Sequence, residues 1–94
     1  MFDARVAESG HVMFKGRLDA SQTEKANQVL SKITVSCTID FKDLEYISSA
    51  GLGTLLMNQK RLIARGEGFT LINLSKPIRD IFMFTGFDRV FKVE

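Results

Sequence analysis

The chain changes from strand-like to helix-like patterning within one stretch, from Ile39 to Leu56, and this change constrains the fold more than any other feature. Before it, apolar residues alternate with polar ones at the period of a strand: Val35, Cys37 and Ile39 against Thr34, Ser36 and Thr38. After it, apolar residues recur at the spacing of one helix face: Leu52, Leu55, Leu56 and Ile63. The sequence therefore predicts a buried strand ending at Asp40, a turn, and a helix that begins at Ser48 and Ser49.

A helix that begins at Ser48 and Ser49 provides a favourable place for a negative charge. The first backbone N–H groups of a helix have no partner within it, and the helix dipole adds partial positive charge there. We therefore expect the fold to tolerate a phosphate on Ser49. Small residues that leave its hydroxyl accessible follow directly: Ala50, Gly51 and Gly53. The alternative interpretation is that either serine serves only as an N-cap, a position that serine favours.

Eight residues of this stretch occur in the order of a known family signature: Asp40, Tyr46, Ile47, Ser48, Ser49, Ala50, Gly51 and Leu52. The signature is an apolar strand, Asp, a short turn, an aromatic or apolar pair, Asp or Ser, Ser, a small residue and Gly-Leu. In this order the stretch resembles STAS domains, named for sulfate transporters and anti-sigma factor antagonists. The resemblance extends to segments 16–19 and 75–86, so it covers almost the whole chain and leaves no appended domain.

The resemblance implies a function in protein binding. In the anti-sigma factor antagonist branch, the serine matching Ser49 is phosphorylated, and Asp commonly stands where this chain has Ser48. Unphosphorylated antagonist captures an anti-sigma factor that is also a serine kinase, which releases the sigma factor; phosphorylation ends the capture and a serine phosphatase restores it. The residues expected to bind the partner are Asp19, Ser48, Ser49, Ala50, Gly51, Gly53, Met57 and Lys60. The family also implies that Asp19 and Asp40 lie near the phosphorylated serine, where Asp40 shapes the site.

Two other functions stay open within the same family. A STAS subunit can regulate a membrane transport ATPase of the ABC type by docking on it constitutively, and other STAS modules bind nucleotides or lipids. Neighbouring genes would separate the three, because each function requires a different partner: a kinase-type anti-sigma factor, a transporter ATPase, or neither.

No arrangement of residues predicts an enzyme. A serine hydrolase needs a base beside its nucleophile, and the only histidine is His11, next to a predicted turn. Ile47 replaces the first glycine of the G-x-S-x-G nucleophile elbow. Leu56 replaces the third glycine of a dinucleotide fingerprint, and no Gly-Lys-Ser/Thr phosphate loop occurs. We therefore expect no catalysis and no cofactor.

The carboxylates around the signature do not predict a metal site either. Asp19, Asp40 and Asp43 match no calcium loop or zinc spacing. Asp40 is expected at the end of the strand and Asp43 in the turn that follows, where capping and Asx hydrogen bonds are their ordinary roles.

Length and composition fit one globular domain over residues 1–94. Thirteen basic and eleven acidic residues are interspersed and give a net charge of +2, so no direct nucleic-acid binding is indicated. The longest apolar runs are too short to insert across a membrane, and residues 1–5 do not begin a secretory signal, so we expect a cytoplasmic protein. The single cysteine, Cys37, excludes an internal disulfide and is expected to be a buried thiol.

The remaining elements are predicted from the same signals. The expected strands are 2–8, 11–17, 34–40, 69–73 and 89–93, with a turn at Ser9-Gly10. The expected helices are 20–31, opened by a capping box from Ser21 to Glu24, a second from Ser48 to the glycines at 66 and 68, and a third from Ser75 to Gly86. The order β-β-α-β-α-β-α-β indicates an α/β fold with a mixed sheet and helices packed on it, in agreement with a STAS domain.

Helical angles separate the exposed apolar residues from the buried ones. Met57 lies about 140° from Leu52 at ~100° per residue, so it is expected to face outward beside Gly53 and Lys60. In the last helix the expected inner stripe is Ile78, Ile81, Phe82 and Thr85. Met83 and Phe84 fall outside this stripe and are expected to pack under the C-terminal strand.

Overall fold

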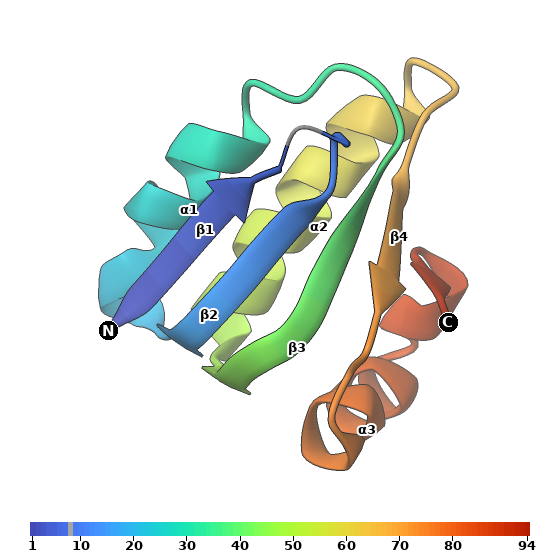
Figure 1. Ribbon diagram of the computed structural model, residues 1–94. Helices are drawn as coiled ribbons and strands as arrows, with labels where there is room; N and C mark the ends of the chain where they lie inside the picture. The colour runs from blue at the N-terminus through green and yellow to red at the C-terminus, as the bar shows by residue number, and fades with distance from the viewer. Residues whose placement is uncertain (8) are drawn as a thin grey trace.

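The computed structural model describes residues 1–7 and 9–94 and contains a five-stranded sheet with three α-helices (Figure 1). The strands are β1 (Phe2–Val6), β2 (Val12–Leu18), β3 (Cys37–Ile47), β4 (Phe69–Ile72) and β5 (Lys92–Val93). The helices are α1 (Thr23–Leu30), α2 (Ser49–Ile63) and α3 (Lys76–Thr85), with short 3-10 turns η1 (Ala20–Gln22) and η2 (Phe87–Arg89). This order confirms the predicted α/β class. Glu8, which was expected to end the first strand, lies outside the described residues.

The sheet is mixed, as predicted, and its strands lie in the order β1-β2-β3-β4-β5. β1 pairs with β2 antiparallel, whereas the remaining neighbours are parallel. The crossovers from β2 to β3 and from β3 to β4 run in one direction across the sheet, and right-handed crossovers then place α1 and α2 on the same face. Figure 1 shows both helices behind the sheet and α3 beyond the end of β4. The carboxyl ends of β2, β3 and β4 therefore lie at the edge from which the helices start.

The core lies between the sheet and the helices, and a row of aromatic rings runs through it. Phe2 and Phe14 have ring centroids 5.2 Å apart, Phe14 and Phe41 5.6 Å, and Phe41 and Phe82 6.0 Å. These rings belong to β1, β2, β3 and α3 in turn, so they join elements that are distant in the sequence. Because buried aromatic side chains contribute large apolar areas, this row ties α3 to the middle of the sheet.

The predicted inner stripe of α2 is wrong at two of its four positions, Leu56 and Ile63. Leu52, Leu55 and Leu62 are buried, but Leu56 is only half-buried and Ile63 is 50% exposed. The buried face also includes two polar residues, Asn58 and Gln59. The prediction assigned only apolar residues to the buried face. It therefore left out these two polar residues and placed the buried face of the helix at a wrong angle.

Gln59 shows how a polar residue is accommodated in the core. Its side-chain oxygen accepts a hydrogen bond from the backbone N–H of Phe69 at 2.8 Å, and its amide nitrogen donates to the carbonyl of Val90 at 2.7 Å. Both the oxygen and the nitrogen of the side-chain amide are thus hydrogen-bonded. Burial of Gln59 therefore does not carry the free-energy cost of an unpaired polar group. Gln59 joins α2 to the start of β4 and to the segment before β5.

β3 differs from its prediction at both ends. It begins at Cys37 rather than at Thr34, and it continues past Asp40 to Ile47. Asp43, expected in a turn, lies within the strand opposite Lys15 of β2. The register of β2 against β3 shifts twice along this stretch. The shifts interrupt the regular alternation of buried and exposed residues, and several exposed residues of β3 are charged. Simple alternation therefore does not predict this part of the strand.

The capping residues and the C-terminal region also differ from expectation. Asp19, not Ser21, opens the first helical segment, because its side chain accepts from the Ser21 N–H. The C-terminal strand β5 is shorter than predicted, and Arg89 belongs to η2. Met83 and Phe84 do not pack under β5; both are exposed. Among the described residues, no helix combines the length and the apolar character needed to cross a bilayer.

Candidate functional site

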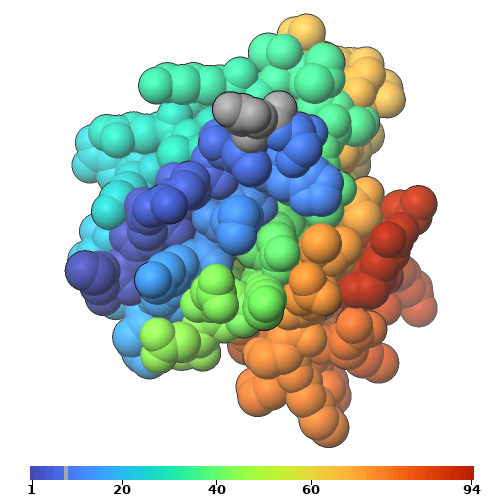
Figure 2. All heavy atoms as spheres, viewed as in Figure 1, coloured from blue at the N-terminus to red at the C-terminus, as the bar shows by residue number. Residues whose placement is uncertain are grey.

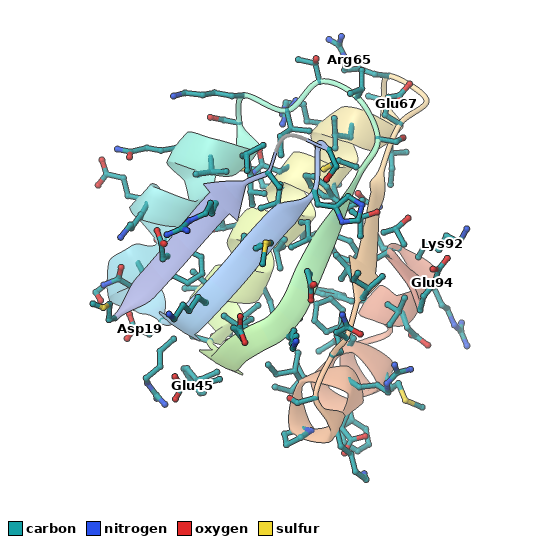
Figure 3. All side chains as sticks on the ribbon, in the orientation of Figure 1. Asp19, Glu45, Arg65, Glu67, Lys92 and Glu94 are labelled. Carbon is teal, nitrogen blue, oxygen red and sulfur yellow. The ribbon has the colours of Figure 1, made fainter. Side chains whose placement is uncertain are left out.

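The candidate site is assembled where β2 and β3 end side by side. Leu18 is paired with Ile47, and the backbone N–H of Ser48 donates to the carbonyl of Leu18 at 2.9 Å. The next residues, Asp19 on one side and Ser49 on the other, therefore leave the sheet at the same edge. Figure 3 shows Asp19 and Glu45 together at this edge. Parallel pairing thus brings together the two segments that the sequence resemblance singled out.

Ser48 is the N-cap of α2. Its backbone is extended, with φ −87° and ψ 168°, and its side-chain oxygen accepts a hydrogen bond from the N–H of Gly51 at 3.1 Å. Its carbonyl accepts the first helical hydrogen bond, from Leu52 at 2.9 Å. Ser48 is half-buried. Its hydroxyl oxygen already stabilises the start of the helix, as expected of an N-cap.

Ser49 is the first residue of α2, and its environment differs from that of Ser48. The residue is exposed, and within the described part of the chain its hydroxyl has no hydrogen-bond partner in the structure. It stands at the end of the helix where unpaired N–H groups and the dipole favour an anion. The two neighbouring serines therefore have separate positions: Ser48 caps the helix, and Ser49 presents a free hydroxyl at its start.

Asp19 places a fixed negative charge at the same edge. One carboxylate oxygen accepts hydrogen bonds from the Ser21 hydroxyl at 2.6 Å and the Ser21 N–H at 3.0 Å. The hydrogen bond from the Ser21 hydroxyl is the main cause that lowers the pKa of Asp19 below its ordinary value. Asp19 is therefore a carboxylate at neutral pH, held in place by the turn η1.

Gly51, expected to contact a partner, is buried and has a packing role instead. A Cβ atom there would lie 2.8 Å from Cγ of Leu18, 2.9 Å from its carbonyl oxygen and 3.0 Å from Cγ1 of Ile47. Only a glycine lets α2 approach the ends of β2 and β3 this closely. Gly51 sets the position of the helix start rather than forming part of the exposed surface.

The outer face of α2 extends from the helix start along one side. Ala50, Gly53, Met57 and Lys60 are spaced three or four residues apart and are all exposed. Met57 is 55% exposed, which confirms its predicted orientation. A Cβ atom on Gly53 would meet nothing within 4 Å, so this face is open at that position. We call Ser49, Ala50, Gly53, Met57 and Lys60 the α2 outer face.

Asp40 lies away from Ser49, contrary to the expectation that it shapes the site. Asp40 is paired with Met13, and Ile47, which ends the strand, is paired with Leu18. Met13 and Leu18 are five positions apart on β2; at about 3.3 Å per residue, roughly 16 Å separates Asp40 from the end of β3. Asp40 instead accepts from the Lys42 N–H at 2.8 Å and the Asn73 side chain at 3.1 Å.

One contact of the site could not be inferred from the sequence. Arg17 and Tyr46 are paired one step before the ends of the strands, and the guanidinium lies 4.4 Å from the centre of the tyrosine ring. This contact depends on β3 reaching Ile47, which the alternation did not predict. Within the described residues, no three His, Cys, Asp or Glu side chains are grouped so that they could hold a metal.

The chain matches known proteins in both sequence and structure. The family model described as "Mlab, STAS domain" matches residues 1–94. The anti-sigma factor antagonist SpoIIAA in its unphosphorylated form has a TM-score of 0.76 at 22% identity, covering 100% of this chain and 88% of that one. The Bacillus cell fate determinant SpoIIAA in its phosphorylated form has a TM-score of 0.72 at 22% identity, with 100% and 91% covered.

A third similar structure is an anti-sigma factor antagonist from Mycobacterium paratuberculosis. Its TM-score is 0.82 at 19% identity, and the match covers 99% of this chain and 83% of that one. At these identities the structural likeness establishes the fold, whereas the family match along the entire sequence establishes the family. The chain belongs to the STAS domain family.

Proposed function

We propose that this protein is an anti-sigma factor antagonist that binds an anti-sigma factor with serine kinase activity and is switched off by phosphorylation of Ser49. The difference between the two serines carries this proposal. Ser48 is engaged as an N-cap, whereas Ser49 is exposed, and its hydroxyl makes no hydrogen bond within the described residues. A kinase can reach Ser49 without disturbing the cap of α2.

The expected consequence of phosphorylation follows from charge. A phosphate adds about −1.5 to −2 charges at neutral pH. The start of α2 accommodates this charge, so the fold is retained. The surface then carries two anionic groups, the phosphate and the Asp19 carboxylate. A partner that binds around Ser49 would have to remove water from both groups and would be repelled by their charge. Binding is lost without unfolding, and a serine phosphatase restores it by removing the phosphate. The proposed exchange takes place in the cytoplasm, where the kinase has access to ATP.

The similar structures support this proposal through their own functions. They include anti-sigma factor antagonists, and SpoIIAA is represented in both its unphosphorylated and its phosphorylated form with the same overall fold. This is consistent with a phosphate that changes the surface and leaves the core intact.

Replacement of Ser49 tests the switch. We expect Ser49→Asp to weaken binding to the kinase-type anti-sigma factor by roughly tenfold or more, about 1.4 kcal/mol, because it adds a carboxylate beside Asp19. Ser49→Ala should bind like wild type and accept no phosphate. Isothermal titration calorimetry measures both. Thr34→Asp is the matched control, because Thr34 is exposed in the loop before β3, whereas Ser49 follows the other end of that strand. Equal affinity for wild type, Ser49→Asp and phosphorylated protein would rule out the phosphorylation switch.

A second candidate is a STAS subunit that docks constitutively on an ABC-type transport ATPase. One residue favours it: antagonists of the family commonly have Asp where this chain has Ser48. In that case the same α2 outer face would bind the ATPase, and no kinase would modify Ser49. The calorimetric series separates the two candidates. Phosphorylation of Ser49 should abolish binding if the protein is an antagonist, whereas a constitutive subunit does not depend on phosphorylation.

A further inference from the structure

β1 forms an outer edge of the sheet, and two hydrogen bonds show which of its backbone groups face the neighbouring strand. β1 is the first strand in the order of the sheet and pairs only with β2. The Arg17 N–H donates to the Met1 carbonyl at 2.7 Å, and the Ala7 N–H donates to the His11 carbonyl at 2.8 Å. Hydrogen-bonded pairs alternate along an antiparallel ladder. In the register of β1 against β2, the hydrogen-bonded pairs therefore fall on the odd-numbered residues of β1.

The even-numbered residues of β1, which are Phe2, Ala4 and Val6, direct their backbone N–H and C=O groups away from the sheet. Within the described residues, no loop or helix cap forms a backbone hydrogen bond with these groups. β1 is five residues long and contains no proline and no bulge, two of the features that commonly protect an edge. The other edge strand, β5, is only two residues long. The free edge of β1 is therefore the one that can pair with a further extended backbone.

A recess lies beside this free edge, between β1 and α1. Its volume is about 400 Å³, and its lining residues are Val6, Gln28, Val29, Lys32 and Ile33. Val6 is on the helix side of β1 but is 56% exposed, so α1 leaves it partly uncovered. Val29 and Ile33 are half-buried and add apolar surface. Figure 2 shows the β1 segment at the surface with the α1 segment beside it. Alternate side chains of an added strand would face this recess.

The charges beside the edge favour an acidic segment. Lys32 is the charged residue that lines the recess, and it forms no ion pair within the described part of the chain. Asp3 and Arg5 lie on the opposite face of β1 and pair with each other at 3.5 Å. On α1, Lys25 lies two turns before Lys32 and has Glu24 beside it. The side of the helix next to the edge thus carries two lysines against one glutamate.

A second copy of this chain does not fit the same edge. A strand that pairs with itself about a two-fold axis is antiparallel, so both copies would place α1 on one face of the joined sheet, at the junction. α1 contacts β1 and lies behind it, toward the free edge (Figure 1). Paired strands are about 4.8 Å apart, whereas packed helices need about 8–10 Å between their axes. The two helices would collide, whereas a single peptide strand brings no helix with it.

We infer that the free edge of β1 binds an extended peptide segment of another protein as an added strand, with an apolar side chain in the recess and an acidic one near Lys32. The outward backbone groups of β1 supply the hydrogen bonds, and the recess selects the side chains. This site is separate from Ser49. Val6 is paired with Val12 at the start of β2, whereas Ser49 follows the far end of β3. The inference therefore does not depend on the proposed function.

Selection from a phage-displayed library of random peptides, with the full chain as the target, tests the inference. We expect the selected peptides to share a stretch that alternates apolar and polar residues and includes Asp or Glu. Val6→Pro removes one outward N–H, at a kind of edge position where proline is tolerated, so it should stay folded and bind a selected peptide at least about tenfold more weakly. The matched control is Val6→Thr, which keeps the N–H and should lose less than about threefold, within the range of one cross-strand side-chain pair.

Amide hydrogen exchange of the wild-type protein, followed by nuclear magnetic resonance, gives a second measurement that holds even if Val6→Pro unfolds. The amides of Ala4 and Val6 should exchange faster than those of Asp3 and Arg5 in the free protein, and a selected peptide should slow them by at least about tenfold. A library that yields no binder, or a binder that leaves these two amides unprotected, would overturn the inference. Equal affinity of folded Val6→Pro and wild type would do the same. A wild-type dimer in sedimentation that is lost in Val6→Pro would assign the edge to a second copy and also overturn it.

Discussion

Replacing Leu55 with alanine is expected to lower the free energy of unfolding by about 2–5 kcal/mol, the range for a fully buried leucine. Leu55 is completely buried on the inner side of α2. Met57→Ala, two residues further along the same helix, should change the free energy of unfolding by no more than about 0.5 kcal/mol, because its side chain is exposed. Urea denaturation monitored by circular dichroism measures both.

Leu56 provides an intermediate case that tests the phase of the helix. It is half-buried, so Leu56→Ala should destabilise the protein less than Leu55→Ala does. Met57→Glu should also remain folded and reduce partner affinity if Met57 contributes to the interface. If Leu56→Ala were the more damaging of the two leucine substitutions, or if Met57→Glu unfolded the protein, the observed orientation of α2 would be wrong.

Two glycines on α2 are expected to respond to alanine in opposite directions. Gly51→Ala places a methyl group 2.8 Å from Cγ of Leu18 and 2.9 Å from its carbonyl oxygen, so the helix has to move away from β2. Overpacking of this kind costs about 1–3 kcal/mol. Gly53→Ala meets no atom within 4 Å, so it should stabilise the protein by roughly 0.5–1 kcal/mol through helix propensity.

The pair is well matched because both glycines lie in the first turns of one helix. Their unfolding midpoints in urea should therefore lie on opposite sides of the wild-type value. If the Gly51→Ala variant were as stable as the wild-type protein, α2 would not contact Leu18 as closely as it does in the structure. Gly53→Ala also serves as a binding probe, because it adds a methyl group to the α2 outer face while keeping the fold.

The start of α2 was predictable from the sequence because local chemistry determines it. A serine N-cap, small residues and a change of period all occur within a few positions, and none depends on distant parts of the chain. The buried face of α2 was not predictable to the residue. Gln59 is a core residue because the Phe69 N–H and the Val90 carbonyl are available to it, and those groups come from segments that follow later in the chain.

The extent of β3 shows a second limit of local reasoning. One face of the sheet is not covered by α1 and α2, so charged residues such as Lys42, Asp43 and Glu45 occupy exposed strand positions and resemble a turn. Only pairing with β2 identifies them as strand. The same pairing shows that Asp40 lies far from Ser49 along the sheet. The family signature alone does not indicate this distance. Likewise, the exposure of Phe84 depends on Phe82 occupying the core beside Phe41 and Phe91.

Phosphate mapping tests the central claim most directly. The protein is incubated with ATP and each kinase-type anti-sigma factor from its source genome, and intact mass and peptide mass spectrometry then locate any phosphate. We predict a single phosphate on Ser49, with none on Ser48, whose oxygen caps α2, or on Thr54, whose hydroxyl donates to the Ala50 carbonyl at 3.2 Å. Phosphate on Ser48 or Thr54, or stable binding to a partner that never modifies Ser49, would contradict the account.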